Sequence, residues 1–192
     1  MVEFIDEDLD LVRSKIKDLE SLVKNQNQNN HFRNYENLED QKEVFEIRKA
    51  GLNILMSLKG DKKPVAFIED CAVTLDHLAD YTSRLKEVFA KYNTNGMFYA
   101  HASVGTLHVR PVLNMKSDQD FKNMKAIAEE AFDMVKEYRG SHSGEHGDGI
   151  VRSEFHEKMF GKKILNTFEE IKDTFDKKNL LNPHKIVRAY KS

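Results

Sequence analysis

Two strand-like segments that follow each other closely in the sequence constrain the fold of this chain more than any other feature. Residues 97–100 and 107–113 both have the composition of short strands, and the link between them contains Ser103 and Gly105. Such a short link cannot carry the chain back across a sheet, so the two strands are expected to pair antiparallel. The fold must therefore contain at least one antiparallel hairpin.

The rest of the chain is dominated by apolar residues at helical spacing. Helices are predicted, in chain order, at residues 7–24, 38–58, 74–92, 117–138, 150–159 and 162–175. Further strands are predicted at residues 2–5 and 65–68, and a polar, asparagine-rich loop at residues 25–30. Strands separated by helices, together with the hairpin, predict an α+β fold. We expect a small, mostly antiparallel sheet covered by helices, an elaboration of the ferredoxin-like arrangement, with residues 1–192 forming a single domain.

Composition excludes several classes of protein. Hydrophobic residues make up 40% of the 192 positions, which is enough for a buried core, and the net charge is only -2. With both signs of charge interspersed, nothing favours nucleic acid or anionic lipid as a partner. No apolar run is long enough to cross a membrane, and the acidic N-terminus does not resemble a secretory signal. We therefore expect a cytoplasmic protein, unless a partner segment missing from this sequence holds it at a membrane surface.

Two histidines flank the link of the predicted hairpin. His101 and His108 are seven positions apart, a spacing that in an unbroken strand would place their side chains on opposite faces. Ser103 and Gly105 interrupt the strand and reset its alternation, so both rings can face one pocket. Arg110 shares a face with His108 and is therefore a candidate for substrate binding. For each histidine the competing interpretation is a half-buried ring held by ordinary hydrogen bonds.

The loop at residues 141–149 is rich in glycine and is centred on the adjacent pair Glu145 and His146. Glycine lets the backbone adopt positive φ and approach a ligand closely. Two imidazoles and one carboxylate form a common ligand set for zinc or a similar divalent ion. The residues therefore predict a metal held by His101, His108 and Glu145, with His146 beside it as an unliganded base. The alternative is that the glycines serve only to turn the chain.

Reactive residues without such neighbours are expected to be structural. Cys71 is the only cysteine, which excludes an intramolecular disulfide and an iron–sulfur cluster held by several thiolates of this chain. It follows two acidic residues, and we expect it to be a small buried apolar residue. Four histidines are expected at the surface: His31, His77, His142 and His156.

At this point the sequence resembles a known family. His101-x6-His108 followed by Ser-Gly-Glu145-His146-Gly is similar to the C-terminal substrate domain of FAD-linked oxidases of the vanillyl-alcohol-oxidase superfamily. This group includes D-lactate, glycolate and D-2-hydroxyglutarate dehydrogenases. The resemblance extends over nearly the whole chain and takes in Phe67-Ile-Glu-Asp70 and the closing Asn182-Pro-His-Lys185. The Phe67-Ile-Glu-Asp70 and His108-Val-Arg-Pro111 segments are most similar to those of the large bacterial forms that fuse flavin and iron–sulfur modules.

The resemblance implies a function and roles for particular residues. His146 would take the hydroxyl proton of a 2-hydroxyacid while the hydride passes to FAD, with the metal on the three ligands named above. Arg48 matches the family's carboxylate-binding arginine, and its planar guanidinium suits that task; an ordinary helix-surface arginine is the alternative. Asn182 and Lys185 match the tail that lies near the flavin, against the alternative of a plain C-terminal turn. Many relatives carry an acidic residue between the two histidines, and this chain has none there.

The sequence also lacks parts that the resemblance would require. It contains no glycine-rich pyrophosphate loop for FAD and no cysteine set for an iron–sulfur cluster. We therefore expect a fragment of a larger flavoenzyme, inactive alone, that binds the substrate while FAD is held mainly by a separate domain of the same enzyme. A stand-alone module that binds metal and ligand without redox activity is the alternative, and a purely structural domain is a third. The electron acceptor remains open.

Overall fold

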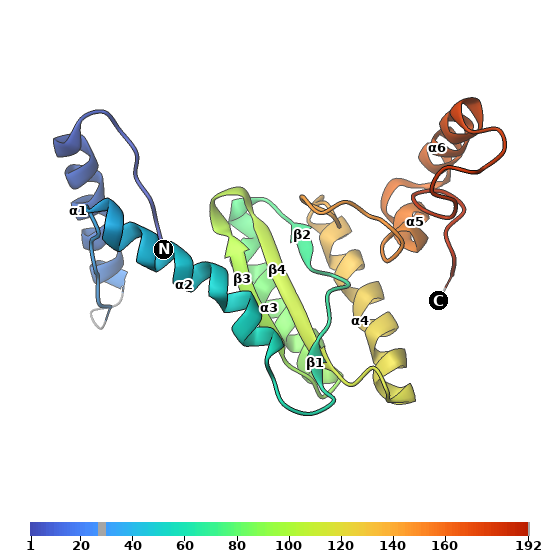
Figure 1. The fold of residues 1–192 in the computed structure, drawn as a ribbon, viewed down its shortest axis with the longest axis horizontal. Coiled ribbons are helices and arrows are strands. Elements are labelled where there is room, and N and C mark those ends of the chain that lie inside the picture. Colours follow the sequence, from blue (N-terminus) through green and yellow to red (C-terminus); the bar gives the residue numbers. More distant parts are fainter. Residues whose placement is uncertain (27–29, 192) are drawn as a thin grey trace. The chain divides into compact units, whose positions relative to one another are not determined.

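The structure is a computed structural model that describes residues 1–26 and 30–191. It divides into two compact units, Met1–Gly51 and Leu52–Ser192, which we call the N-terminal and the C-terminal unit. Figure 1 labels the elements along the chain.

The N-terminal unit is helical. It contains α1 (Leu9–Gln26) and the larger part of α2 (Leu38–Met56), which confirms two predicted helices. Arg13 forms two hydrogen bonds with the carboxylate of Glu36, at 3.2 and 2.8 Å.

The predicted strand at residues 2–5 is wrong, because this segment has no regular structure and is mostly exposed. The described residues of this unit contain no other strand with which it could pair, and a strand requires a hydrogen-bonded neighbour. The predicted loop at residues 25–30 overlaps α1, which extends through residue 26. Residues 27–29 lie outside the residues that the structure describes.

The C-terminal unit contains a small sheet built around one central strand. Its strands are β1 (Lys63–Pro64), β2 (Asp70–Ala72), β3 (Gly96–His101) and β4 (Thr106–Leu113). β4 pairs with β3 along one edge and with β1 and β2 along the other, and every pairing is antiparallel. The hairpin and the α+β class with a small antiparallel sheet are therefore confirmed.

The predicted strand at residues 65–68 is wrong. Between the register pairs Pro64↔Val112 and Asp70↔His108, residues 65–69 lie opposite residues 109–111, so the first strand bulges away from β4. Val65 donates a backbone hydrogen bond to the carbonyl of Pro111, but Pro111 has no N–H group to donate in return. A ladder bond is missing at this point, and the segment divides into two short strands.

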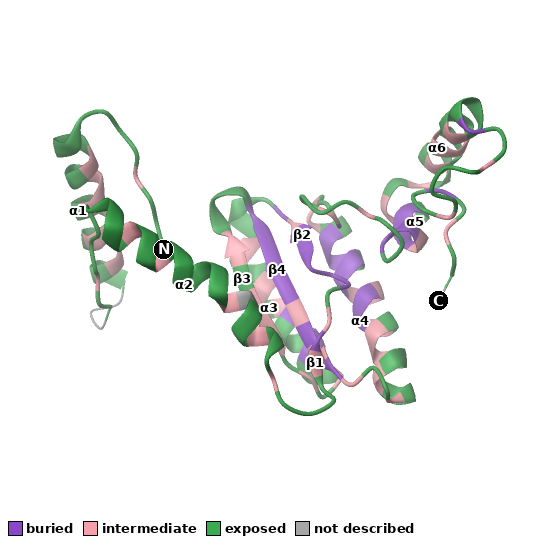
Figure 2. Ribbon diagram, viewed as in Figure 1, coloured by how far each residue is buried: buried purple, intermediate pink, exposed green. Residues whose placement is uncertain are grey.

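Two helices and one face of the sheet enclose the core. α3 (Leu75–Lys91) and α4 (Asp118–Glu137) both contact β4, and they run along the sheet in Figure 1. Their buried positions recur at helical spacing, and Figure 2 shows buried residues along β4 and on α4. The fully buried large side chains include Tyr81, Leu85, Phe89, Val109, Ile127, Phe132 and Val135. Cys71 belongs to this core with 0% exposure, and burial raises the pKa of its thiol to about 12.

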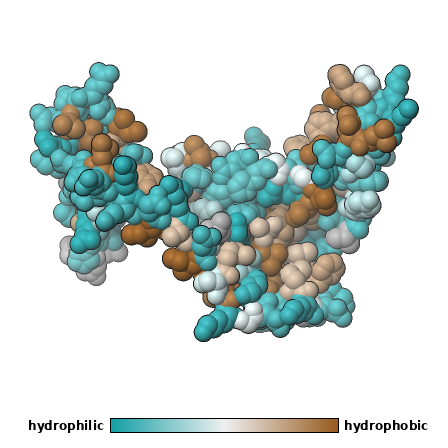
Figure 3. Space-filling model, viewed as in Figure 1, coloured by the Kyte–Doolittle hydropathy of each residue, from teal (hydrophilic) through white to brown (hydrophobic). Residues whose placement is uncertain are grey.

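The chain after α4 is more exposed. It forms a loop, a 3-10 turn (Ser153–Phe155), α5 (His156–Phe160) and α6 (Lys162–Phe175), so the helix predicted at 150–159 begins later than expected. None of the residues of α6 is buried. Figure 3 shows apolar side chains at the surface of this segment, and Phe175 and Leu180 are 84% and 72% exposed. No helix in the described part of the chain is long and apolar enough to cross a membrane.

Candidate functional site

The β3–β4 hairpin brings the two predicted histidines onto one face of the sheet. In the register of the pair, Tyr99 lies opposite His108, and His101 lies opposite Thr106. Residues directly opposite in an antiparallel pair point to the same face, so His101 and His108 are diagonal neighbours there. Their ring centroids are 5.0 Å apart. The prediction that the link resets the strand alternation is confirmed.

Gly105 makes this tight link possible. Its φ is +72°, in the left-handed region, and a Cβ atom on it would lie 1.8 Å from the carbonyl oxygen of Val73. The backbone N–H of Val73 in turn donates to the carbonyl of Gly105 at 3.1 Å. Only glycine satisfies both the conformation and the close approach at this position.

A buried carboxylate, Asp70, fixes the glycine-rich loop beside the histidines. Its Oδ2 accepts hydrogen bonds from the backbone N–H groups of Glu145 and His146, at 2.9 and 2.7 Å. Its Oδ1 lies 2.6 Å from Nη2 of Arg152, and its side chain is 0% exposed. Burial alone would raise the pKa of Asp70, but the two backbone N–H bonds and the Arg152 charge outweigh it and hold the pKa below its usual value. Asp70 is therefore an ionised anchor that presents Glu145 and His146 to the site.

Gly144 allows the loop to come this close to β2. Its N–H donates to the backbone carbonyl of Asp70 at 2.7 Å. A Cβ atom at this position would lie 2.8 Å from that same oxygen and 3.2 Å from the Thr106 hydroxyl. The glycine predicted to permit a close backbone approach does so, although the partner is β2 and not a ligand.

Glu145 meets the histidines in the space above the hairpin. Its Oε1 lies 2.9 Å from His108 Nε2, 3.6 Å from His101 Nε2 and 3.6 Å from His146 Nε2. One ligand atom from each of His101, His108 and Glu145 lies within 4.8 Å of the others. The structure thus brings together all four residues predicted for the metal and the base.

His108 is the buried member of this group and the best test of whether a metal fits. Its side chain is 2% exposed, and neither ring nitrogen has a hydrogen-bond partner among the described residues. Burial lowers the pKa of His108, although the charge of Glu145 opposes this, so the ring favours its neutral form with a free lone pair. A buried neutral imidazole beside a carboxylate suits a divalent cation. A second set, Glu69, His108 and His146, meets the same distance criterion.

Glu69 supports the far side of the His108 ring. Its Oε1 lies 3.8 Å from His108 Nδ1 and 2.5 Å from Nη2 of Arg110. Carboxylates behind metal-binding histidines fix the ring orientation and raise its basicity. At 3.8 Å the contact with His108 is one of charge and not a hydrogen bond, and Glu69 is the buried acidic residue on this side of the ring. The aromatic ring of Tyr99 stacks on His108 with centroids 4.4 Å apart.

The other predicted site residues are Arg48, Arg110, Asn182 and Lys185. Arg48 belongs to the N-terminal unit, so its role remains a prediction. Arg110 shares the His108 face as expected, and its guanidinium contacts Glu69 and the sulfur of Met56. Asn182 and Lys185 lie in the exposed C-terminal segment, where the Lys185 ammonium donates to the Asn182 side-chain oxygen at 3.3 Å. The expected role of these two residues near a flavin also remains a prediction.

Sequence reasoning missed the residues that position the site. Asp70, Glu69 and Arg152 carry charge but are buried, at 0%, 5% and 6% exposure. One sequence feature could have indicated that Glu69 and Asp70 are buried: this acidic pair directly follows the apolar residues Phe67 and Ile68. Charged residues are rarely buried unless they are paired, so a buried acidic pair would also have predicted a buried cationic partner. Two of the four histidines expected at the surface, His142 and His156, are also buried, at 1% and 0% exposure, so that prediction is wrong for them. His31 and His77 are exposed, as expected.

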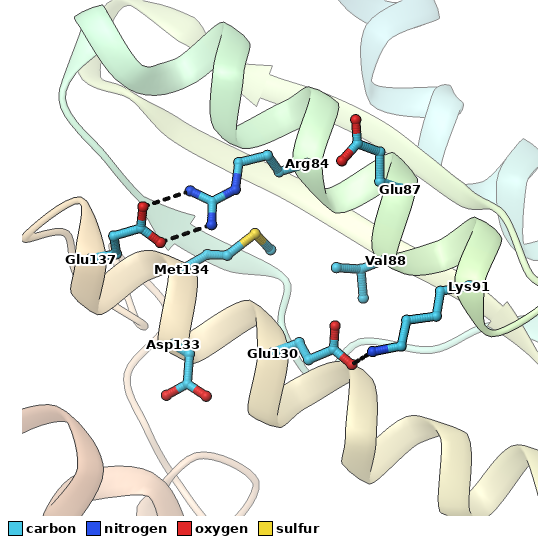
Figure 4. Close-up of a pocket in the computed structure, with 8 residues that line it drawn as sticks. All are labelled: Arg84, Glu87, Val88, Lys91, Glu130, Asp133, Met134 and Glu137. Carbon is cyan, nitrogen blue, oxygen red and sulfur yellow. Dashed lines mark hydrogen bonds and ion pairs between the residues drawn. The ribbon is translucent and has the colours of Figure 1, made fainter.

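One cavity lies away from these residues. It measures about 380 Å³ and lies between α3 and α4. Figure 4 shows that its walls carry the ion pairs Arg84–Glu137 and Lys91–Glu130, which satisfy each other across the two helices. Paired surface charges of this kind are typical of a helix interface.

Comparisons with known proteins give a consistent set of relatives. Residues 1–186 match the family model described as FAD linked oxidases, C-terminal domain. The chain is 35% identical to D-2-hydroxyglutarate dehydrogenase of Pantoea ananatis over 149 residues. This alignment covers 78% of the chain and 14% of that protein. It is 27% identical over 143 residues to glycolate oxidase subunit GlcD of Bacillus subtilis, covering 74% of this chain and 30% of that protein. Mitochondrial D-lactate dehydrogenase (cytochrome) of Arabidopsis thaliana is 28% identical over 78% of this chain and 26% of its own length.

The chain thus spans only a minor part of each of these relatives. The family model, by contrast, covers nearly all of the chain, including both histidines of the hairpin and the Glu145–His146 loop. This chain belongs to the family of C-terminal domains of FAD-linked oxidases.

Proposed function

We propose that this chain is the substrate- and metal-binding part of an FAD-dependent oxidoreductase that oxidises a D-2-hydroxyacid of the lactate, glycolate or 2-hydroxyglutarate class. One observation carries the proposal: Glu145 Oε1 lies 2.9 Å from His108 Nε2 and 3.6 Å from the Nε2 atoms of His101 and His146. The relatives named above support the class of substrate, since their names refer to D-2-hydroxyglutarate, glycolate and D-lactate.

His101, His108 and Glu145 would hold a divalent metal, with zinc as the first candidate for two imidazoles and a carboxylate. A bound divalent ion would supply Lewis-acid polarisation of the substrate's hydroxyl and carboxylate oxygens. His108 would contribute the buried ligand, because Tyr99 stacks on its ring and the Glu69 carboxylate lies 3.8 Å from its Nδ1. His101 and Glu145 are 40% and 43% exposed, which leaves one side of the site accessible to a small molecule.

His146 would accept the substrate's hydroxyl proton. Its side chain is 44% exposed, and its backbone N–H is held by Asp70 at 2.7 Å, so the ring is both reachable and anchored. In its neutral form an imidazole has one lone pair, and hydrogen-bond reach to the hydroxyl is the geometric condition for a general base. The ring of His146 stacks beside that of His108 with centroids 5.3 Å apart, which keeps it close to the proposed ligands.

Arg48 and Arg110 are the proposed partners of the substrate carboxylate. A guanidinium binds a planar carboxylate through two parallel hydrogen bonds. Arg110 lies on the same sheet face as His108, and its Nε is buried without a hydrogen-bond partner among the described residues. A carboxylate placed there would satisfy that atom.

FAD is proposed to be held mainly by another domain of the same enzyme, because the printed sequence contains no glycine-rich pyrophosphate loop. The residues of this chain therefore do not fit a flavin site of their own. Near Asn182 and Lys185, the exposed apolar side chains of Phe175 and Leu180 support the proposal that this end of the chain packs against such a domain.

The proposal is tested in an enzyme that contains this chain together with its flavin domain. D-2-hydroxyglutarate, D-lactate and glycolate are offered in turn, and the bleaching of the flavin absorbance is followed for the wild type, His146→Asn and the control His77→Asn. We expect one acid to reduce the flavin, and His146→Asn to lower the rate about 10²–10⁴-fold with unchanged zinc content.

Three results would contradict this. Retained turnover in His146→Asn would refute the assignment of the base. Binding of zinc and of a 2-hydroxyacid without any reduction, even with the flavin domain present, would favour the binding module without redox activity. Absence of metal, with stability unchanged by a chelator, would favour a purely structural domain.

A further inference from the structure

A second group of metal-ligating side chains lies near the first but shares no residue with it. It consists of His142 and Asp148, both from the glycine-rich loop, and His156, the first residue of α5. One ligand atom from each lies within 4.8 Å of the others. Both imidazoles are buried, at 1% and 0% exposure, and the proposed function uses none of the three residues.

The hydrogen bonding of His156 leaves a lone pair directed at a carboxylate. Its Nδ1 lies 2.8 Å from the carbonyl oxygen of Ile186, which can only accept, so Nδ1 must carry a hydrogen. In the neutral ring Nε2 is then an acceptor, and it lies 2.9 Å from Oδ2 of Asp148. Two acceptors at this distance require a positive charge between them, either a proton or a metal ion.

His142 separates these two possibilities. Its Nε2 lies 3.4 Å from Oδ1 of Asp148, and neither of its ring nitrogens has a hydrogen-bond partner among the described residues. A proton on His156 would satisfy the pair with Asp148 and would leave His142 buried without a partner. An ion bound by all three residues pairs Nε2 of both histidines with the Asp148 carboxylate, and leaves only Nδ1 of His142 without a partner among these atoms.

The surroundings favour a metal site. The ring of His142 is enclosed by aromatic side chains, with Phe132 and Phe160 centroids both at 5.5 Å. Ligand atoms around a tetrahedral ion with bonds of about 2.0–2.1 Å are ~3.3 Å apart, close to the separations seen here. His142 and Asp148 also line an open pocket of about 260 Å³, which provides an entry path and room for a fourth ligand such as water.

We propose that His142, Asp148 and His156 form a second site for a divalent transition-metal ion, with zinc as the probe. The ion would join the loop to α5 and, through the bond from His156 to Ile186, to the C-terminal segment. Asp148 lies three residues after Glu145 in the same loop, so the second site also restrains the segment that carries Glu145 and His146. Its existence does not depend on the proposed function.

The test counts zinc ions bound by the full chain after loading and desalting. The variants are Glu145→Gln for the first site, His142→Leu and the isosteric Asp148→Asn for the second, and His31→Leu as a control at an exposed histidine. We expect about two ions in the wild type and the control, about one in each single-site variant, and none in Glu145→Gln combined with His142→Leu.

The zinc counts can refute either site separately. If His142→Leu and Asp148→Asn both bind as much zinc as the wild type, the second site is refuted. If Glu145→Gln loses no ion but His142→Leu loses one, the second site stands and the first is wrong. Should the second-site variants fail to fold, cobalt(II) bound to Glu145→Gln combined with His146→Asn decides the matter, because this double variant removes a ligand from both candidate sets at the first site. A visible ligand-field spectrum then supports the second site, and its absence overturns it.

Discussion

Arg152 and Asp70 form an ion pair in the interior of the C-terminal unit. Nη2 of Arg152 lies 2.6 Å from Oδ1 of Asp70, and the two side chains are 8% and 0% exposed. Nη1 of the same arginine donates to the carbonyl oxygen of Gly147 at 2.6 Å. Arg152 therefore holds both the loop and the carboxylate that anchors the loop, so the geometry of Glu145 and His146 depends on a residue that contacts neither a ligand nor a reacting atom.

Removing this arginine should be costly. Arg152→Leu leaves the Asp70 carboxylate buried without its counter-charge, and breaking one partner of a buried pair typically costs about 3–5 kcal/mol of unfolding free energy. The matched control is Lys116→Leu, which removes an ion pair with Asp61 whose side chains are 77% and 58% exposed. That change should cost less than about 1 kcal/mol. Urea denaturation of both variants measures the difference, and equal effects would contradict the anchoring role.

Gly144 offers a steric test of how the loop is seated. In Gly144→Ala the new methyl group would lie 2.8 Å from the Asp70 carbonyl oxygen, so the loop must shift. We expect a loss of about 1–3 kcal/mol in stability and weaker metal binding. Gly51→Ala serves as the control, because no atom lies within 4 Å of its Cβ position in α2, and alanine favours the helix by up to ~1 kcal/mol. Thermal unfolding and zinc titration of the two variants measure these effects. Unchanged zinc affinity in Gly144→Ala would contradict the claim that the close packing of this loop on β2 positions the metal ligands.

Glu69 should act on the metal through His108. Glu69→Gln removes the charge behind His108 Nδ1 while preserving side-chain volume, and loss of such a partner typically weakens metal affinity about 10–100-fold. Glu87→Gln changes an exposed glutamate on α3, outside both histidine clusters, and should leave zinc affinity unchanged. Isothermal titration with zinc distinguishes the two, and an equal affinity for both variants would show that Glu69 has no such role.

Asp176 makes the end of α6 sensitive to acid. A hydrogen bond from Lys172 and backbone N–H bonds from Leu180 and Leu181 lower the pKa of Asp176 from 3.8 to about 2. A lowered folded-state pKa contributes stability that is fully present above about pH 4 and is lost as pH falls through about 2. The melting temperature of Asp176→Asn should therefore lie below that of the wild type at pH 7, and the gap should close toward pH 2. A gap that is the same at both pH values would exclude this linkage.

The histidine site was predictable because its information is local. Gly105 lies between His101 and His108, so the reset of strand alternation follows from the sequence itself. The helices of the core were equally predictable from their apolar periodicity. In both cases the residues that determine the structure are neighbours along the chain.

The remaining features depend on contacts between residues far apart in the sequence. The break at residues 65–68 arises because Pro111 faces this segment and has no N–H to donate, which requires knowing the strand order. His142 and His156 are buried because the aromatic rings of α4 and α5 and the backbone of Ile186 enclose them. Likewise, Asp70 becomes an anchor only once the loop at residues 141–149 is placed against β2.

The central claim is that Glu145, and not Glu69 or His146, completes a metal site with His101 and His108. An anomalous difference map from zinc-loaded crystals of this chain tests it most directly. We predict a peak bonded to His101 Nε2, His108 Nε2 and a carboxylate oxygen of Glu145, at about 2.0–2.2 Å, with the His146 ring unbonded. A peak held instead by Glu69, His108 and His146, or no peak beside His108 at all, would contradict the account.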